Sequence, residues 1–316
     1  MTATPAIKTC CAIIGLLLPA AAASLAVAGG MPIAATTESV AVPAAEGGPV
    51  RLLFIHHSCG GQLLAEPGAQ EGGGKDSAAR CIYRSHPNGG GLRSLLQAAG
   101  YEVHEATYGS LLGEDTDIGH WRRKFAEQMD RILVCDEQDR SYTDGRTNEI
   151  VVFKSCYSST DFTGPGKEPG DPDATEQTLA NAKAAYRALL PLFRSRPDVL
   201  FVAVTAPPRA EPQPQGLKDR LGAAFRRGPV SADHAHALHA WMADRAGGWL
   251  RDYDLPNVAV FDYHAILTDS RSAKWSAYAS GGGRDSHPNR EGNARAAAAF
   301  VPFLDEAVAA RRAGGR

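Results

Sequence analysis

The sequence predicts an α/β fold in which a parallel sheet of about five strands is doubly wound, so that helices cover both faces in three α/β/α layers. Short apolar runs of strand length alternate with stretches of helical periodicity along most of the chain, and this alternation is typical of parallel sheets. Of the 316 residues, 44% are hydrophobic, which is enough to bury the core of a large domain. One such domain fills the length, and we find no internal repeat in the sequence.

Five apolar runs are the predicted strands. The first, residues 50–55, reads Val-Arg-Leu-Leu-Phe-Ile and ends at a polar turn. The other four have similar length and lie at residues 101–107, 149–153, 199–205 and 257–261. Apolar runs this short, bounded by turn residues, are typical of strands buried on both faces of a parallel sheet.

Helical patterns fill the intervals between these runs. The strongest lies at residues 175–194, where apolar side chains recur at three- and four-residue steps: Leu179, Ala182, Tyr186, Leu189 and Phe193. We expect Pro191 to kink its last turn. The other predicted helices span residues 91–99, 119–133, 231–253 and 290–312.

The connections that leave the carboxyl ends of the predicted strands are long. They are rich in glycine and proline and span residues 60–90, 158–172 and 207–230. An open parallel sheet binds its ligands outside those ends of its strands. We therefore expect a functional site at this edge, partly covered by the first of these loops.

The N-terminus has the pattern of a secretory signal peptide. Lys8 is the only charged side chain before Glu38, and an apolar stretch ends in Ala26-Val27-Ala28, the small-x-small pattern that signal peptidase cuts. A retained membrane anchor is the alternative, because the stretch is nearly long enough to span a bilayer. We expect cleavage, a secreted or periplasmic location, and no stable membrane insertion afterwards.

The predicted domain organisation follows from this cleavage. Residues 1–28 are the signal peptide, 29–49 a flexible linker, 50–312 the α/β domain and 313–316 a tail. The whole chain carries 33 basic and 35 acidic residues, a net charge of −2, and no long basic run. Proteins that bind nucleic-acid backbones usually have a strong positive excess, so we expect no nucleic-acid partner.

Four cysteines remain after the signal peptide: Cys59, Cys81, Cys135 and Cys156. In an oxidising compartment they can form two disulfides, in three possible pairings. No Cys-x-x-Cys pair is present, which argues against a zinc cluster. We favour Cys59–Cys81, which would close the glycine-rich loop between them, and four free thiols are the alternative.

Two polar segments at the same predicted sheet edge are candidates for chemistry. Ser58 follows the first strand in the run His-His-Ser-Cys-Gly-Gly, so its hydroxyl can face an open crevice and the backbone N–H groups after it can point at a developing oxyanion. His287 lies between the last predicted strand and the last helix, two residues after Asp285. A histidine there can act as a general base that a carboxylate orients.

Three blocks resemble the SGNH (GDSL-type) serine hydrolases, as an outlying branch. They are residues 54–60 (Phe-Ile-His-His-Ser-Cys-Gly), 204–208 (Val-Thr-Ala-Pro-Pro) and 285–289 (Asp-Ser-His-Pro-Asn). The resemblance implies a flavodoxin-like α/β/α domain and an esterase with a Ser-His-Asp triad. Carried over, Ser58 is the nucleophile, His287 the base and Asp285 its orienting carboxylate.

The sequence departs from the family pattern at several positions. The usual Gly-Asp-Ser-Leu is His-His-Ser-Cys here, and one residue rather than two separates the acid from the histidine. The oxyanion glycine of the family maps onto Gly109, whose N–H would act together with that of Ser58. The oxyanion asparagine has no match, and a hydroxyl of Ser155, Ser158 or Ser159 is the expected substitute.

Other side chains near these blocks have alternative roles. The acid could come from Asp161 or Asp262 instead of Asp285. We expect His56 to pack at the end of its strand and His57 to line the crevice. The segment 233–239 is rich in histidine, and His236 and His239 share a helix face, but no further ligand is evident at useful spacing. We interpret this face as solvated rather than as a metal site.

The sequence leaves three hypotheses for function. The first is an exported serine esterase that hydrolyses a short-acyl ester, with an O-acetylated carbohydrate as the expected example by family analogy, and that requires no metal or organic cofactor. The second is a non-catalytic module on the same fold that binds a ligand or carbohydrate. The third is a metal-dependent phosphoesterase that uses the histidine-rich helix.

Overall fold

The computed structural model describes residues 48–74, 77–210, 231–268 and 277–314. The predicted signal peptide, most of the predicted linker and most of the predicted loop 207–230 lie outside these ranges. The last helix continues to Gly314, two residues past the predicted end of the domain.

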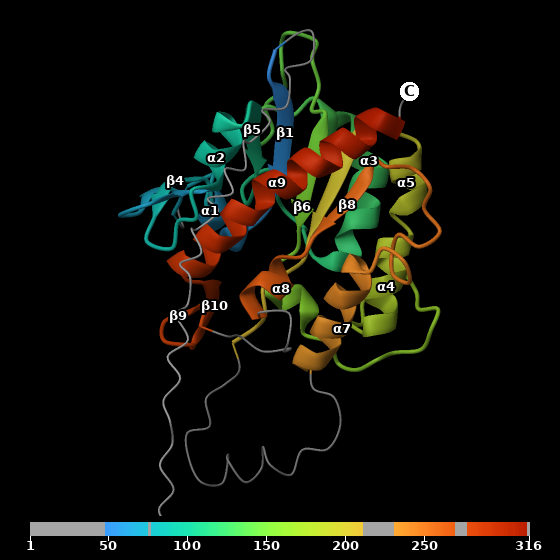
Figure 1. Cartoon of the computed structure of the whole chain (residues 1–316). Helices are drawn as coiled ribbons and strands as arrows, with labels where there is room; N and C mark the ends of the chain where they lie inside the picture. Colours follow the sequence, from blue (N-terminus) through green and yellow to red (C-terminus); the bar gives the residue numbers. More distant parts are fainter. Residues whose placement is uncertain (1–47, 75–76, 211–230, 269–276, 315–316) are drawn as a thin grey trace, which may run out of the picture. The chain divides into compact units, whose positions relative to one another are not determined.

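A sheet of five parallel strands forms the centre of the fold, as the sequence predicts (Figure 1). Its order is β5-β1-β6-β7-β8, and all of its pairings are parallel. The strands are β1 (Val50–Ile55), β5 (Tyr101–Ala106), β6 (Ile150–Lys154), β7 (Leu200–Val204) and β8 (Val258–Phe261). The chain moves from β1 to one neighbour and then crosses to the other side, an order typical of flavodoxin-like sheets.

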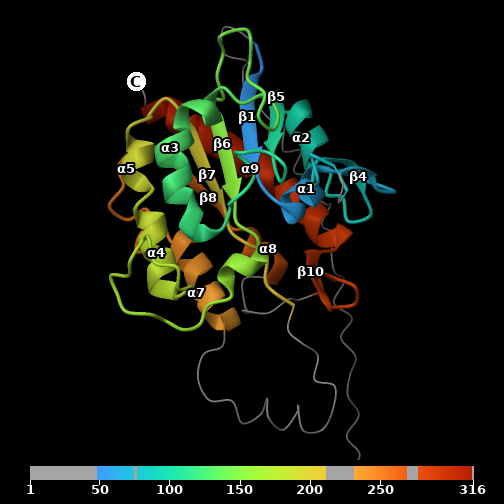
Figure 2. The same cartoon turned by 180° about the vertical axis from the view of Figure 1, so that it is seen from behind.

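Two helical layers cover the sheet, one on each face. Alternate strand residues face opposite layers, and in β1 Leu53 and Ile55 pack into one core while Leu52 and Phe54 pack into the other. The first layer contains α3 (Trp121–Leu133), α4 (Leu179–Arg187), α5 (Leu190–Arg194) and α7 (Ser231–Ala243). The second contains α1 (Ser58–Leu64), α2 (Leu92–Ala98), α8 (Tyr263–Thr268) and α9 (Arg290–Gly314). Figure 1 shows α9 crossing one face, and Figure 2 shows α3 on the other.

The strongest predicted helix is divided in the structure. Residues 175–177 lie in a loop, and α4 begins after Thr178, whose hydroxyl accepts a hydrogen bond from the Asn181 N–H. A second helix, α5, follows with Pro191 in its first turn, because a proline has no N–H to continue the preceding helix. The helix predicted at 231–253 ends at Ala243.

Two small sheets were missed in the sequence. The loop 60–90 contains three short strands, β2 (Glu66–Pro67), β3 (Glu71–Gly72) and β4 (Tyr83–His86), and a hairpin of β9 (Ala279–Ser280) and β10 (Asp285–Pro288) precedes α9. Strands of two to four mostly polar residues show no apolar run and no alternation, so the sequence carries no signal for them.

The predicted Cys59–Cys81 disulfide is wrong for this structure, in which all four described cysteines are free. The Cys59 sulfur instead lies 3.7 Å from that of Cys156. The backbone of Cys81, rather than its side chain, approaches α1: a Cβ on Gly61 would lie only 1.9 Å from the Cys81 carbonyl oxygen. The glycine-rich loop is therefore held against α1 by close backbone packing.

Candidate active site

Ser58 lies at the carboxyl edge of the sheet, at the first turn of α1. β1 ends at Ile55, two histidines follow, and the carbonyl of His57 accepts hydrogen bonds from the N–H groups of Gly60 and Gly61. Among the described residues, the N–H groups of Ser58 and Cys59 have no hydrogen-bond partner. A helix leaves its first N–H groups unpaired in this way, so both are available to an anionic oxygen.

The turn after Ser58 requires glycine at two positions. A Cβ on Gly60 would lie 2.4 Å from the Cβ of His56, and the Cβ of a residue replacing Gly61 would meet the Cys81 carbonyl. Real Cβ atoms do not approach other atoms this closely. The two glycines therefore allow the chain to fold back from β1 into α1 directly after the serine.

A hydrogen-bonded chain joins Ser58 to the two candidate residues near the C-terminus. His287 Nε2 lies 2.9 Å from Ser58 Oγ, and His287 Nδ1 lies 2.7 Å from Asp285 Oδ1. Asp285 also accepts from the backbone N–H of His287 at 3.1 Å. Ser58 and His287 are 229 positions apart in the sequence.

The strand β10 explains why Asp285 can contact His287 with only one residue between them. In an extended strand, residues two positions apart point to the same face, so Asp285 and His287 lie together. Ser286 points elsewhere, and its hydroxyl accepts a hydrogen bond from the N–H of Ala210. The shortened spacing of the sequence is thus compatible with an aspartate–histidine contact.

The hydrogen bond between Asp285 and His287 also determines which ring nitrogen of His287 carries the proton. Burial alone would raise the pKa of Asp285, but the hydrogen bonds from the His287 ring and backbone outweigh it and lower that pKa. An ionised Asp285 accepts the Nδ1–H, which leaves Nε2 as an acceptor for the Ser58 hydroxyl. Tyr157 packs edge-on against the His287 ring, with ring centres 5.6 Å apart.

Gly109 is not arranged as the resemblance implies. Its N–H donates to Glu114 Oε1 at 2.9 Å, so this donor is already occupied. Its φ angle is +90°, and a Cβ there would lie 1.9 Å from the carbonyl oxygen of Ala78. Glycine is required at this turn by conformation and packing.

The three serines after β6 have different environments. Ser155 Oγ accepts from the indole N–H of Trp121 at 2.7 Å, and Ser159 donates to Asp117 at 2.5 Å. Ser158 is exposed, and its hydroxyl has no partner among the described residues. All but Ser155 belong to the short helix η2 (Tyr157–Thr160), which also carries Tyr157 against His287.

His57 is buried rather than lining an open crevice, so this prediction is wrong. Its ring stacks on Tyr108 at 3.5 Å between centres, its Nε2–H donates to the Gly113 carbonyl, and its Nδ1 accepts from Thr116. The loop after β5 supplies these partners, and nothing in the sequence near His57 indicates them.

His56 packs at the end of its strand, as the sequence predicts, and is fully buried. Its Nε2 lies 2.8 Å from Glu105 Oε2, and Arg93 pairs with the same carboxylate. The sequence does not indicate these contacts, because an ion pair between Glu105 in β5 and Arg93 in α2 has no local sequence signature.

The two alternative acids face other groups. Asp161 pairs with Arg209. Asp262 accepts from the Thr205 hydroxyl at 3.1 Å and from the Ala265 N–H at 3.0 Å. Asp285 is therefore the carboxylate that contacts His287.

The predicted solvated histidine face of α7 is wrong. His239 is buried, and its ring lies 4.5 Å from that of His264 in α8, with His236 5.6 Å from the same ring. A sequence view of α7 alone cannot show this packing, since His264 comes from another helix. Among the described residues, no group of three histidine, cysteine or acidic side chains is arranged to hold a metal ion.

Burial of neutral histidines makes the fold sensitive to acid. Desolvation lowers the pKa of His57 and of His264 to about 4, and that of His239 well below its usual value. The unfolded chain therefore binds more protons than the native protein below about pH 6.5. The native protein therefore keeps its full free energy of unfolding above about pH 6.5. That free energy decreases as the pH falls toward 4, because these histidines must stay neutral in the native protein.

We expect the free energy of unfolding to fall by about 1.4 kcal/mol per pH unit for each such histidine within this window. Urea unfolding at about pH 7.5 and about pH 5 measures the slope. In His264→Gln the free energy of unfolding should depend less steeply on pH, because the unfolded variant takes up about one proton fewer. An equal free energy of unfolding at the two pH values in the unsubstituted protein would contradict the expectation.

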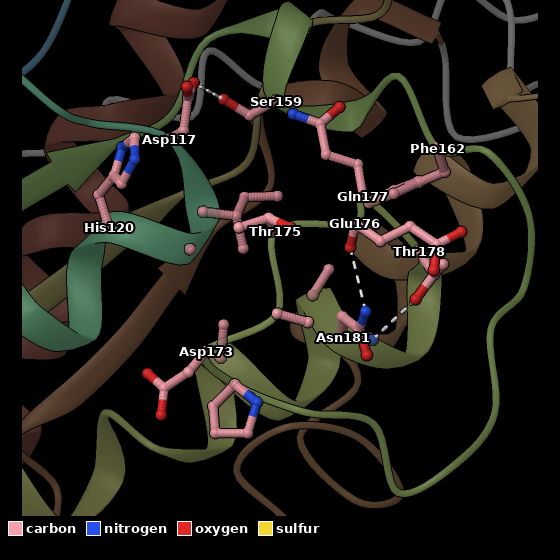
Figure 3. A pocket seen from close by; sticks show the side chains of 16 residues that line it. Asp117, His120, Ser159, Phe162, Asp173, Thr175, Glu176, Gln177, Thr178 and Asn181 are labelled. Atoms are coloured by element: carbon pink, nitrogen blue, oxygen red, sulfur yellow. Dashed lines mark hydrogen bonds between the residues drawn. The ribbon is translucent and has the colours of Figure 1, made fainter.

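A cavity of about 270 Å³ lies beside η2 (Figure 3). Its walls come from η1 (Ile118–His120), from η2 and from the segment that enters α4. Ser159 and Asp117 meet at one wall, and Asn181 bonds Glu176 and Thr178 at another. The lining is rich in carboxylate, amide and hydroxyl groups. No pattern in the sequence indicates this cavity.

Two solved structures are distantly similar to the chain. No family model and no curated protein matches the chain. The crystal structure of phospholipase A1 from Streptomyces albidoflavus NA297 is 14% identical with a TM-score of 0.34, over 82% of this chain and 98% of that one. Another solved structure is 17% identical with a TM-score of 0.39, over 82% of this chain and 97% of its own. None of the described helices is long and apolar enough to cross a membrane.

Proposed function

We propose that this protein is a serine ester hydrolase with a Ser58–His287–Asp285 triad. The observation that carries the proposal is the chain of hydrogen bonds from Ser58 Oγ through the His287 ring to Asp285, at 2.9 and 2.7 Å. Its order and atoms are those that a serine nucleophile, a general base and an orienting carboxylate require.

The reaction begins with transfer of the Ser58 proton to His287 Nε2 as Oγ attacks the ester carbonyl. The unpaired N–H groups of Ser58 and Cys59 at the start of α1, together with the exposed Ser158 hydroxyl, supply donors for the oxyanion. His287 then returns the proton to the leaving alcohol. A water molecule, deprotonated by His287, releases the acyl group and regenerates Ser58.

The substrate class that we propose is a short-acyl ester, with an O-acetylated carbohydrate as its representative. The cavity beside η2 supports the carbohydrate part, because carboxylate, amide and hydroxyl side chains such as Asp117, Gln177 and Asn181 line it and can bind sugar hydroxyls. The signal-peptide pattern of residues 1–28 supports a secreted or periplasmic enzyme that meets such polymers.

The test is an ester panel of increasing acyl length on a common chromogenic alcohol, followed by acetylated oligosaccharides. We expect turnover that is fastest for acetate and absent in Ser58→Ala. Binding of acetylated oligosaccharides without turnover of any ester would contradict the proposal and support a non-catalytic binding module on the same fold.

A further inference from the structure

Two buried thiols, one of them on the residue that follows Ser58, contact each other. Cys59 Sγ and Cys156 Sγ are 3.7 Å apart in a hydrogen bond, and the two residues are separated by 97 positions in the sequence. Cys59 belongs to the first turn of α1, and Cys156 follows β6. Cys59 is fully buried, whereas Cys156 is 8% exposed.

The surroundings favour a thiolate on Cys156. The hydrogen bond from Cys59 lowers the pKa of Cys156 well below its usual value against the effect of burial, and the Lys154 ammonium and the Tyr157 N–H act in the same direction. Burial raises the pKa of Cys59. Cys156 is therefore the more acidic thiol of the pair.

Lys154, beside this pair, is a buried cation. Its side chain is 1% exposed, and its ammonium donates to the Ser155 carbonyl at 3.0 Å. Among the described residues, no carboxylate forms an ion pair with it. Since a buried ammonium is costly without a counter-charge, Lys154 stabilises a negative sulfur nearby.

We propose that Cys59 and Cys156 form a reversible disulfide by exchange with a small oxidised disulfide such as glutathione disulfide. The function proposed for Ser58 is not needed for this inference. In the structure the two sulfurs already touch, so closure requires a shift of less than 2 Å to the usual bond length of about 2.05 Å.

The exchange proceeds in two balanced steps. The Cys156 thiolate attacks one sulfur of the oxidant, which forms a mixed disulfide and releases one small thiolate. Cys59 then attacks the Cys156 sulfur and gives its proton to the departing thiolate. The two cysteines lose two electrons, and the oxidant is reduced to one small thiolate and one small thiol. Cys156 is the first to react because it is the more exposed and the more acidic thiol.

A disulfide between Cys59 and Cys156 would link covalently the two chain segments that carry Ser58 and Tyr157. Cys59 is the sequence neighbour of Ser58, and Cys156 is the neighbour of Tyr157, which packs on His287. A bond that closes a loop of nearly 100 residues removes much chain entropy from the unfolded state. We expect the oxidised protein to melt on the order of 10 °C above the reduced protein.

Thiol counting tests the inference without any catalytic assay. The purified protein is reduced, freed of reductant, treated with glutathione disulfide, denatured, alkylated and mapped by mass spectrometry. We expect Cys59 and Cys156 to be protected from alkylation and joined in one crosslinked peptide. Cys81→Ser and Cys135→Ser are the matched controls and should give the same crosslink, whereas Cys156→Ser should leave Cys59 open to alkylation.

Complete alkylation of Cys59 and Cys156 after this treatment would overturn the inference, as would a crosslink from either residue to Cys81 or Cys135. The unsubstituted protein gives the deciding result, so a variant that fails to fold does not affect it. A crosslink in a protein that hydrolyses no ester would support the disulfide and contradict only the proposed function.

Discussion

Replacing His287 by alanine is expected to lower kcat/KM for a short-acyl ester by about 10⁴-fold or more. The imidazole contacts both Ser58 and Asp285, and alanine removes the only base in hydrogen-bond contact with the Ser58 hydroxyl among the described residues. A serine hydroxyl is a weak nucleophile without such a base. Steady-state kinetics on the chromogenic acetate measure the loss.

A double variant that combines Ser58→Ala with His287→Ala tests whether the two residues act together. Residues that act as one unit give strongly non-additive losses, so the double variant should be no slower than either single variant. Ser286→Ala is the control, because Ser286 lies between Asp285 and His287 but bonds the N–H of Ala210. A loss below about tenfold in His287→Ala would contradict the assignment of the base.

Replacing Asp285 by asparagine is expected to lower kcat by about 10²- to 10⁴-fold with little change in KM. The amide of asparagine can donate to His287 Nδ1, which would place the ring proton on Nε2 and prevent it from accepting the Ser58 proton. We expect a loss toward the lower end of this range, because the Asp285 side chain is 50% exposed and water can partly replace it.

Kinetics and thermal unfolding together separate this effect from a folding defect. Asparagine preserves the size of the aspartate, and the side chain at position 285 is half exposed, so the melting temperature should stay close to that of the unsubstituted protein. An unchanged kcat in Asp285→Asn would show that another group orients His287.

The central sheet and the two ends of the candidate site are accessible to sequence reasoning because their signals are local. Each strand is a short apolar run, and Ser58 and His287 each follow such a run at the same sheet edge. The one-residue spacing between Asp285 and His287 departs from the family pattern, but β10 places both side chains on one face of a strand. A local sequence pattern therefore predicts which residues form the candidate site. It does not predict the distances and hydrogen bonds between them.

The features that sequence reasoning missed depend on contacts between distant segments. Cys59 meets Cys156 rather than Cys81, and His239 packs on His264 rather than facing solvent. The Gly109 amide is an exception, because its partner Glu114 is only five residues away in a turn that hydrophobic periodicity does not describe. The contacts between distant segments depend on how helices and loops pack in three dimensions, which periodicity does not encode.

Labelling with a fluorophosphonate tests the triad most directly, because the reagent forms a covalent adduct only with an activated serine. The purified protein is labelled and the modified residue located by mass spectrometry, with His287→Ala and Ser286→Ala treated in parallel. The triad predicts an adduct on Ser58 in the unsubstituted protein and in Ser286→Ala, and none in His287→Ala. A folded protein that remains unlabelled at Ser58, or labelling that survives in His287→Ala, would contradict it.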